Sequence, residues 1–206
     1  AVATYRCIQI SLQASEETSG LFDVTLGALT GGEGTSPAIA GGRLLLDPNR
    51  PRITCEAEGR QIDLGGIGKG FALDEMAKIL ADLDVQSALL SAGGSTHLVM
   101  GPFGWPIELR GDKECLSVTI KEQALSSSGT GQQGAHVVHP DTGDAPEYVF
   151  KRVWAIARSA ALADAFSTAC LIMDAGEIEA FVRSQEGETE VYAENATDGS
   201  IIRFRQ

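Results

Sequence analysis

The chain has few basic side chains for its size and no long apolar run. Its 206 residues include 16 Lys and Arg against 28 Asp and Glu, which gives a formal net charge of −12. Binding to a nucleic-acid backbone depends on a basic surface, so this charge disfavours nucleic acid as a partner. A membrane helix needs about 18 or more consecutive apolar residues, and no stretch approaches that length. We expect neither a nucleic-acid partner nor a membrane-spanning segment in this chain.

The sequence also lacks any close pair of cysteines. Cys7, Cys55, Cys115 and Cys170 lie far apart, and no C-x-x-C motif occurs. This spacing indicates neither a zinc ribbon nor a dense disulfide framework. Because cysteine is among the most buried residues of folded proteins, we expect all four to be ordinary buried thiols.

What the sequence does contain is typical of a folded domain. Apolar residues make up 43% of the chain and charged residues 21%, which is close to the average for globular proteins. The length suits a single domain, which we expect to span residues 1–206. Residues 31–42 are rich in Gly, Ser, Thr and Pro, a composition that predicts a flexible loop.

Helical and strand patterns alternate along the chain. Apolar residues at helical spacing predict helices, and short runs between turn residues predict strands. The predicted helices are 4–18, 71–83, 160–173, which Ser159 would cap, and a short one around Ile178 and Phe181. The predicted strands are 44–46, 53–57, 61–64, 87–91, 97–100, 117–120, 135–138, 153–157, 189–193 and 200–204. We therefore expect an α+β or mixed α/β fold.

The densest local signal is the segment 63–70, which reads D-L-G-G-I-G-K-G between a predicted strand and a predicted helix. Glycines let a backbone approach a phosphate, helix N–H groups point at it, and Lys69 adds a positive charge. The alternative is a glycine-rich turn with a surface lysine. The spacing fits neither the Walker loop nor the dinucleotide fingerprint. A phosphate-binding site in this segment would therefore differ from both of these nucleotide-binding motifs.

A second candidate lies on the helix predicted from residue 160. Asp164 and Thr168 are four residues apart, so both project from one helix face. Mg²⁺ takes oxygen ligands and keeps several waters, so these two groups, a backbone carbonyl and a substrate phosphate would suffice to bind it. The alternative is a solvated Asp and a Thr bonded to the preceding turn.

Histidines and serines give weaker signals. His136 and His139 occupy opposite faces of a predicted strand, so we do not expect them to share a metal. A structural role for His136 is the alternative to a chemical one. Residues 126–128 are three serines without a G-x-S-x-G elbow, which favours a hydroxyl-rich turn over a nucleophile.

Six segments in chain order resemble motifs of the ApbE family of FAD:protein FMN transferases. They are 20–27 (G-x-F-D-P-T-x-G in the family), 63–70 (D-L-G-G-I-A-K-G), 91–94 (N-A-G-G), 128–129 (S-G), 136–143 (H-I-I-D-P-x-T-G) and 163–169 (A-D-A-x-x-T-A). Each motif alone is short, but their order along nearly the whole chain makes the combination specific. The chain departs from the family at Val24, Ser91, Ser95 and His139.

The resemblance implies an ApbE-like, T-fold-related domain with helices packed on a mostly antiparallel sheet. It also implies a Mg²⁺-dependent transferase, in which a Thr or Ser hydroxyl of an acceptor protein attacks FAD, receives FMN and releases AMP. FAD and the acceptor protein would be the partners. Two alternative hypotheses use the same scaffold, a Mg²⁺-dependent FAD pyrophosphatase and a non-catalytic FAD-binding module.

Carried over position by position, the resemblance assigns the metal ligands and the FAD site, and physical chemistry suggests two catalytic roles. The metal ligands would be Asp164, Thr168 and the backbone carbonyl of Gly68. His136 would accept the proton of the incoming hydroxyl, and Lys69 would neutralise phosphate charge. The FAD site would be lined by Phe22, Asp23, Asp63, Gly66, Lys69, Gly93, Gly94, Ser128 and His136.

The resemblance begins at the first predicted helix. Family members generally carry a segment before it that supplies part of the flavin pocket, so we expect an N-terminally short domain. The family also suggests the periplasmic side of the cytoplasmic membrane. Because the cysteines suit a reducing cytoplasm equally well, the compartment stays open.

Overall fold

A computed structural model describes residues 2–27, 43–56, 61–130, 137, 139–140, 142–144 and 146–206. The helices of this part of the chain are α1 (Val2–Glu17), α3 (Gly68–Asp82), α4 (Ala160–Cys170) and α5 (Ala175–Ser184). The strands are β1 (Leu44–Leu46), β2 (Ile53–Cys55), β3 (Ala88–Ala92), β4 (Thr96–Met100), β5 (Trp105–Arg110), β6 (Cys115–Ile120), β7 (Ala124–Gly129), β8 (Phe150–Ala157), β9 (Glu190–Asn195) and β10 (Ile201–Phe204).

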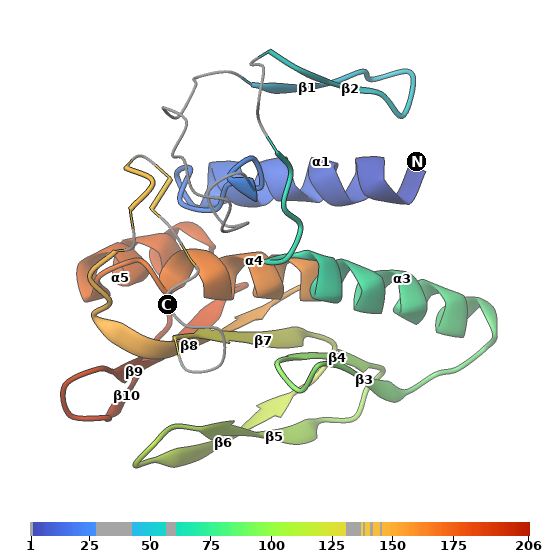
Figure 1. Cartoon of the computed structure of the whole chain (residues 1–206). Coiled ribbons are helices and arrows are strands. Elements are labelled where there is room, and N and C mark those ends of the chain that lie inside the picture. The colour runs from blue at the N-terminus through green and yellow to red at the C-terminus, as the bar shows by residue number, and fades with distance from the viewer. Residues whose placement is uncertain are drawn as a thin grey trace.

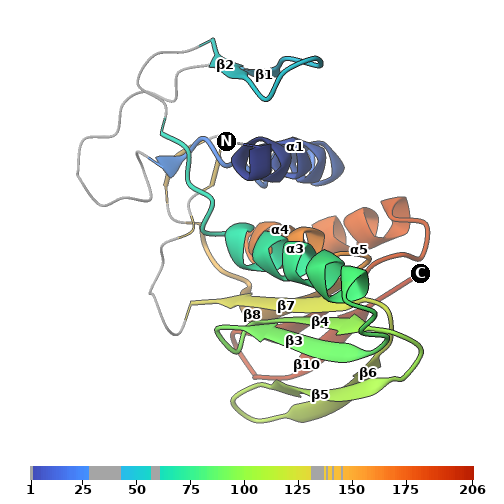
Figure 2. The same cartoon turned by 90° about the vertical axis from the view of Figure 1, so that its right-hand side faces the viewer.

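The centre of the fold is a six-stranded sheet in the order β10-β9-β8-β7-β4-β3. All its neighbouring strands pair antiparallel. The helices α3, α4 and α5 form a layer over one face, and α1 lies beyond that layer (Figure 1). The β1–β2 hairpin lies beyond α1, and the β5–β6 hairpin covers the opposite face of the sheet (Figure 2). The predicted mixed fold with helices on a mostly antiparallel sheet is confirmed.

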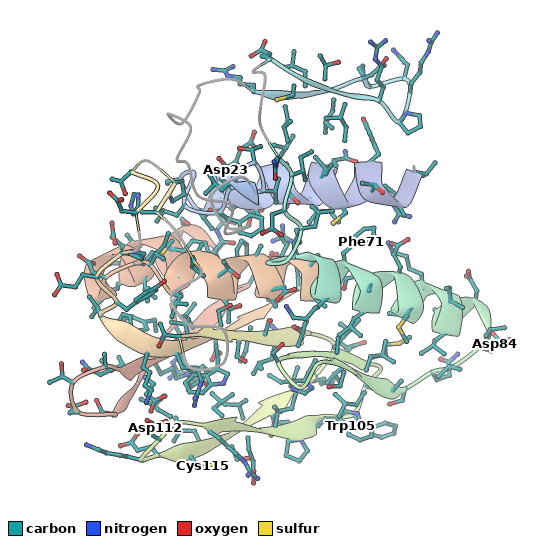
Figure 3. The ribbon with its side chains drawn as sticks, in the orientation of Figure 1. Asp23, Phe71, Asp84, Trp105, Asp112 and Cys115 are labelled. Carbon is teal, nitrogen blue, oxygen red and sulfur yellow. The ribbon has the colours of Figure 1, made fainter. Side chains whose placement is uncertain are left out.

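Each face of the sheet has its own apolar core. The larger core lies between the sheet and the helices and includes Phe166, Leu162 and Val153. The smaller core lies under the β5–β6 hairpin, where Leu109 and Ile120 pack with residues of β4, β7, β8 and β9. Figure 3 shows Phe71 between α3 and α1, and Trp105 and Cys115 on the hairpin. The sheet is therefore covered on both faces.

The α4 helix is the most enclosed element. Ten of its eleven residues are buried, and Thr168 is the exception. The Ser159 side chain accepts a hydrogen bond from Leu162 N, as the sequence predicts for its N-cap. The Asp74 carboxylate of α3 accepts two more, from Ala160 N and Ala161 N at 2.9 Å each. Because α4 is buried and its N-terminus is capped by two side chains, it holds the Thr168 side chain in a defined position.

Glycine brings α3 and α4 into backbone contact. A Cβ on Gly70 would overlap the carbonyl of Ala160 and lie 2.6 Å from Ala161 N. Only a residue without a side chain allows this approach, which explains the last glycine of the segment 63–70.

Several sequence-based expectations are wrong. Residues 61–64 form no strand, and only Gln61 makes a bridge, to Leu26. The serines 126–128 belong to strand β7 and not to a turn. The last predicted long helix ends at Cys170 and not at residue 173. Cys7 and Cys170 are buried as expected, but Cys55 and Cys115 are exposed.

Other expectations concern parts of the chain that the structure does not describe. The predicted loop 31–42 lies outside the described residues, as does most of the predicted strand 135–138. Within the described ranges no helix is long and apolar enough to cross a membrane.

Candidate functional site

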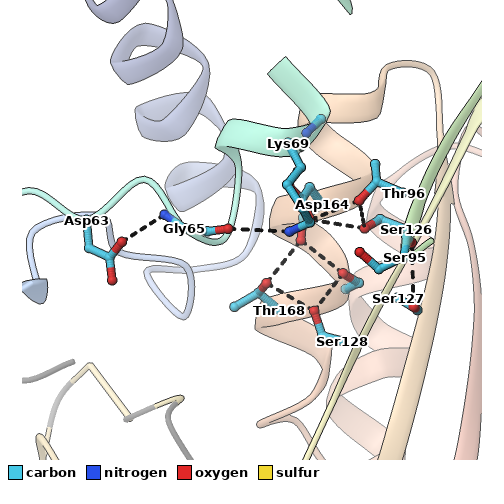
Figure 4. A network of polar contacts seen from close by, with 12 residues as sticks. Asp63, Gly65, Lys69, Ser95, Thr96, Ser126, Ser127, Ser128, Asp164 and Thr168 are labelled. Carbon is cyan, nitrogen blue, oxygen red and sulfur yellow. Dashed lines mark hydrogen bonds and ion pairs between the residues drawn. The ribbon is translucent and has the colours of Figure 1, made fainter. Parts of the chain in front are cut away.

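The Asp164 carboxylate lies at the centre of a polar network between α4, α3 and the sheet (Figure 4). Lys69 Nζ lies 3.2 Å from Asp164 Oδ1, and Asp164 itself is only 2% exposed. Ser126 Oγ donates to the same oxygen at 3.0 Å. Gly70 N donates to Asp164 Oδ2 at 3.2 Å. A buried carboxylate needs such partners, and here they come from two separate elements, α3 and β7.

Two further hydroxyls lie close by on α4 and the sheet. Thr168 Oγ1 donates to the Asp164 carbonyl at 3.1 Å, one turn along the helix. Ser128 Oγ is within hydrogen-bond distance of Thr168 Oγ1, at 3.2 Å, and of Ser167 Oγ, at 2.9 Å. Thr168 is the one residue of α4 that is not buried, so its side chain lies at the margin of the enclosed network.

The glycine-rich turn before α3 lies directly against Thr168. A Cβ on Gly66 would lie 3.2 Å from Thr168 Oγ1 and 3.1 Å from Phe22 Cε2. The turn is held by Asp63, whose Oδ1 accepts a hydrogen bond from Gly65 N at 2.8 Å. Lys69 Nζ donates to the Gly65 carbonyl at 3.5 Å. The sequence therefore places a helix N-terminus and a lysine beside the Asp164 network, as an anion site requires.

The turn between β3 and β4 closes another side of the site. Gly93 and Gly94 have φ angles of +62° and +73°, which glycine adopts without strain. A Cβ on Gly93 would lie 3.9 Å from Lys69 Cδ. The two glycines thus bring a bare backbone turn next to Lys69.

The structure brings most of the predicted site residues together. Lys69, Gly66, Gly93, Ser128, Asp164 and Thr168 belong to one connected set of contacts. Gly68 begins α3 one residue before Lys69. The metal and flavin roles of these residues remain predictions.

Two other predicted residues take different positions, and a third is not among the described residues. Phe22 is buried in the larger core, and its ring packs against the turn at Gly66. Asp23 Oδ1 accepts hydrogen bonds from Thr25 N and Oγ1 at 2.8 and 2.7 Å, which forms a local turn. His136 lies outside the described residues, so its catalytic role also stays a prediction.

Sequence reasoning missed two partners of Asp164. Thr96 and Ser126 are both fully buried, and their hydroxyls lie 2.9 Å apart. Thr96 Oγ1 is also 3.5 Å from Asp164 Oδ1. Their pairing across β4 and β7 depends on strand register. A single sequence gives no signal for that register.

Burial perturbs two ionisable groups at the edge of the site. Burial raises the pKa of Asp74, while the N–H groups of Ala161 and Ala160 oppose that shift. Burial also lowers the pKa of His97, with a smaller opposing effect from the backbone of Gly94. The neutral forms of both side chains are therefore favoured relative to exposed groups.

The oxygen donors fit a hard cation. Asp164 Oδ2 accepts a hydrogen bond from Gly70 N and has further lone pairs for a metal, while Thr168 adds a neutral hydroxyl oxygen. The described residues contain no cluster of three or more His, Cys, Asp or Glu that could hold a metal by themselves. A single carboxylate with hydroxyl, carbonyl and ligand oxygens suits Mg²⁺ and does not suit a softer metal.

This arrangement defines a class of protein. It is a mixed α/β protein in which a glycine-rich helix start with a lysine lies beside the buried carboxylate of Asp164, an arrangement that suits a phosphorylated ligand and a divalent cation.

Comparisons with known proteins agree with this class. The model of the ApbE family matches residues 2–193. The FAD:protein FMN transferase of Buchnera aphidicola subsp. Baizongia pistaciae is 24% identical over 204 residues, which cover 82% of this chain and 60% of that protein. The Escherichia coli K12 protein of the same name is 25% identical over 214 residues, which cover 86% and 61%. The crystal structure of Pseudomonas stutzeri flavinyl transferase ApbE in its apo form matches with a TM-score of 0.82 at 22% identity, over 98% of this chain and 72% of that chain.

The chain belongs to the ApbE family. It spans about 60% of the length of the two curated relatives just described.

Proposed function

We propose that this chain transfers the FMN moiety of FAD to a Thr or Ser hydroxyl of an acceptor protein, with Mg²⁺ as cofactor and AMP as the leaving group. The observation that carries the proposal is the contact between Lys69 and Asp164 beside a glycine-rich helix start. The relatives are named FAD:protein FMN transferases, which supports both the flavin substrate and the protein acceptor.

The reaction exchanges one bond at phosphorus for another. The acceptor oxygen bonds to the flavin-side phosphorus of FAD, and the bond from that phosphorus to the bridging oxygen breaks. AMP leaves with the bridging oxygen, and the hydroxyl proton passes to a base. We assign this base to His136, because imidazole titrates near neutral pH.

The chain's own residues would bind and orient the pyrophosphate. Lys69 and the N–H groups at the start of α3 would bind its oxygens, since both present positive potential there. Asp164, Thr168 and the Gly68 carbonyl would hold Mg²⁺. When bound, Mg²⁺ would neutralise charge that develops on phosphate oxygens. Positioning and charge neutralisation are the chief requirements of such a transfer.

The two alternative hypotheses differ in what attacks the phosphorus. In a FAD pyrophosphatase water replaces the acceptor hydroxyl, so free FMN and AMP form. A binding module holds FAD and leaves it intact. Binding of FAD alone therefore does not distinguish the three hypotheses.

The deciding experiment follows the fate of both halves of FAD. The protein is incubated with FAD, Mg²⁺ and a purified flavoprotein domain that carries a target Thr, and the intact mass of that domain is measured beside the AMP released. Addition of FMN with an equal amount of AMP supports the transferase. Free FMN and AMP without addition would select the pyrophosphatase, and intact FAD the binding module.

A further inference from the structure

The two carboxylate oxygens of Asp164 have different surroundings. Oδ1 lies 3.2 Å from Lys69 Nζ, accepts a hydrogen bond from Ser126 Oγ at 3.0 Å and lies 3.5 Å from Thr96 Oγ1. Oδ2 accepts a hydrogen bond from Gly70 N at 3.2 Å. Because a carboxylate oxygen has about two lone-pair sites, the donors around Oδ1 fill it. Oδ2 is therefore the better placed oxygen for a metal.

Ser126 and Thr96 form a pair of fully buried hydroxyls beside this carboxylate (Figure 4). They lie directly opposite each other on β7 and β4, with their oxygens 2.9 Å apart. Ser126 gives its single hydroxyl proton to Asp164, so the proton between the two hydroxyls comes from Thr96. A chain of donors therefore runs from Thr96 through Ser126 to Asp164, and such chains strengthen each bond where water is excluded.

The donors around Oδ1 differ in how firmly the fold holds them. Strands β4 and β7 are inner strands of the six-stranded sheet, and each pairs with a neighbour on both sides. Their short hydroxyl side chains are thus fixed by the backbone. Lys69 instead carries its ammonium group on a flexible stem of four carbons. It is the donor that can leave Oδ1 while the others stay.

The proposed function makes two demands on the pair of Lys69 and Asp164. Lys69 must bind a phosphate oxygen, and Asp164 must hold Mg²⁺. Because both the ammonium group and Mg²⁺ are cations, a metal at the carboxylate repels Lys69, while a phosphate attracts it. Asp164 is only 2% exposed, and a buried charge that loses its partner is strongly destabilised. Other donors must then compensate its charge.

We propose that Thr96 and Ser126 are positioning residues that hold the Asp164 carboxylate in place when Lys69 moves from it to a phosphate of the ligand. The two hydroxyls keep Oδ1 hydrogen-bonded, and Gly70 N keeps Oδ2 at the start of α3. Asp164 thereby stays ready to bind the metal without its lysine. This inference rests on the proposed function, because it requires a phosphate and a metal at one site.

The alternative is that the two hydroxyls only stabilise the sheet. Cross-strand pairs of Thr and Ser do so by bonding to each other. In that case their removal would cost the same whether or not Lys69 is present. If they hold Asp164, each donor covers for the loss of the other, so the two losses are not additive.

The first test measures this coupling in the protein without metal or FAD. Lys69→Met removes the charge and keeps most of the stem, and a hydroxyl-free variant combines Thr96→Val with Ser126→Ala. We expect Lys69→Met to lower the melting temperature by about 3 °C or less in the wild type, and by about 6 °C or more in the hydroxyl-free variant. Ser11→Ala is the matched control, because Ser11 is 1% exposed and donates to the Cys7 carbonyl instead. Its effect should simply add to that of Lys69→Met.

The second test measures metal binding without turnover. Mn²⁺ takes the same kinds of oxygen ligands as Mg²⁺, and its free form is followed by electron paramagnetic resonance. We expect the hydroxyl-free variant to raise the Kd for Mn²⁺ about tenfold, because Lys69 is then needed at the carboxylate and resists displacement. Thr96→Ser, which keeps the hydroxyl, and Ser11→Ala should retain the wild-type Kd. Asp164→Asn identifies the Mn²⁺ that binds at this site.

Three results would overturn the proposal. The first is an additive loss of melting temperature when Lys69→Met is combined with the hydroxyl-free variant. The second is a wild-type Kd for Mn²⁺ in the hydroxyl-free variant, or the same increase in Ser11→Ala. The third is a wild type that binds no Mn²⁺ and leaves FAD intact. This last result contradicts the proposed function itself and is recognised before any variant is made.

Discussion

The ammonium group of Lys69 lies 3.2 Å from the buried carboxylate of Asp164. The lysine belongs to the first turn of α3 and the aspartate to the middle of α4. One residue was predicted from its sequence to bind phosphate and the other to bind a cation. Their contact means that the two roles share one place, so a phosphate of the ligand and a metal would be neighbours there.

The first prediction concerns the carboxylate. Asp164→Asn keeps the shape of the side chain but removes the only charged metal ligand proposed. We expect Mg²⁺-dependent FAD turnover to fall about 100-fold or more, and Thr168→Ala to lower it about tenfold, since water replaces a neutral ligand. AMP release over a Mg²⁺ titration measures both effects. Asp198→Asn, on the β9–β10 turn, is the control, and unchanged turnover in Asp164→Asn would exclude the metal assignment.

The second prediction concerns the phosphate-binding turn. Lys69→Ala should weaken FAD binding about tenfold, because a charge-assisted contact is lost. Gly66→Val should weaken it further, since its side chain would press on Phe22 and Thr168. Fluorescence titration with FAD measures both affinities. Wild-type affinity for FAD in both variants would mean that this turn has a structural role only.

The third prediction separates two glycines of the same segment. A Cβ on Gly68 would approach only Leu64 Cβ, at 4.0 Å. Gly68→Ala should therefore leave the free energy of unfolding unchanged or raise it by about 0.5–1 kcal/mol. Gly70→Ala should lower it by about 2 kcal/mol or more, because the methyl group would overlap the Ala160 backbone. Urea unfolding measures the free energy of unfolding of both variants. Equal values for Gly68→Ala and Gly70→Ala would contradict the close contact between α3 and α4.

The fourth prediction concerns the base. If His136 accepts the hydroxyl proton, His136→Ala should bind FAD normally but transfer FMN about 10²–10⁴-fold more slowly. The acidic limb of its pH–rate profile should disappear. His139→Ala is the matched control and should transfer nearly normally. Transfer at the wild-type rate by His136→Ala would leave the base to be sought elsewhere, with Asp141 the next residue to test.

The fifth prediction concerns pH and His97. Because burial lowers the pKa of His97 in the folded state, the unfolded chain binds a proton more readily. The resulting stability is present above the unfolded pKa of about 6.5 and is lost as the pH falls through the lower folded value. The wild type should lose more thermal stability than His97→Gln between pH 7 and pH 5. A parallel loss in both proteins would contradict this role.

The sequence predicts those parts of the fold that local patterns determine. Ser159 marks the start of α4, and short apolar runs mark β9 and β10 near the predicted ranges 189–193 and 200–204, because caps and strand patterns are local. Strand β7 was missed because its serines have no strand preference of their own and are held by neighbours on both sides. Strand β5 was missed because Pro106 lies within it, which its place in a two-stranded sheet allows.

The candidate site shows the same division between local and distant information. Local patterns and the family motifs each single out Asp164 and Lys69, but as separate residues. The hydrogen bonds of Thr96 and Ser126 to Asp164 join residues far apart in the chain. Such contacts depend on tertiary packing, which no pattern in one sequence encodes.

The backbone contact at Gly70 also limits how the molecule can move. Since α3 and α4 touch through main-chain atoms, neither helix can shift without the other. We therefore expect the two helices to move as one unit, which fixes the spacing of the backbones that carry Lys69 and Asp164. The backbones that carry Lys69 and Asp164 would then keep their spacing both when substrate enters and when AMP leaves.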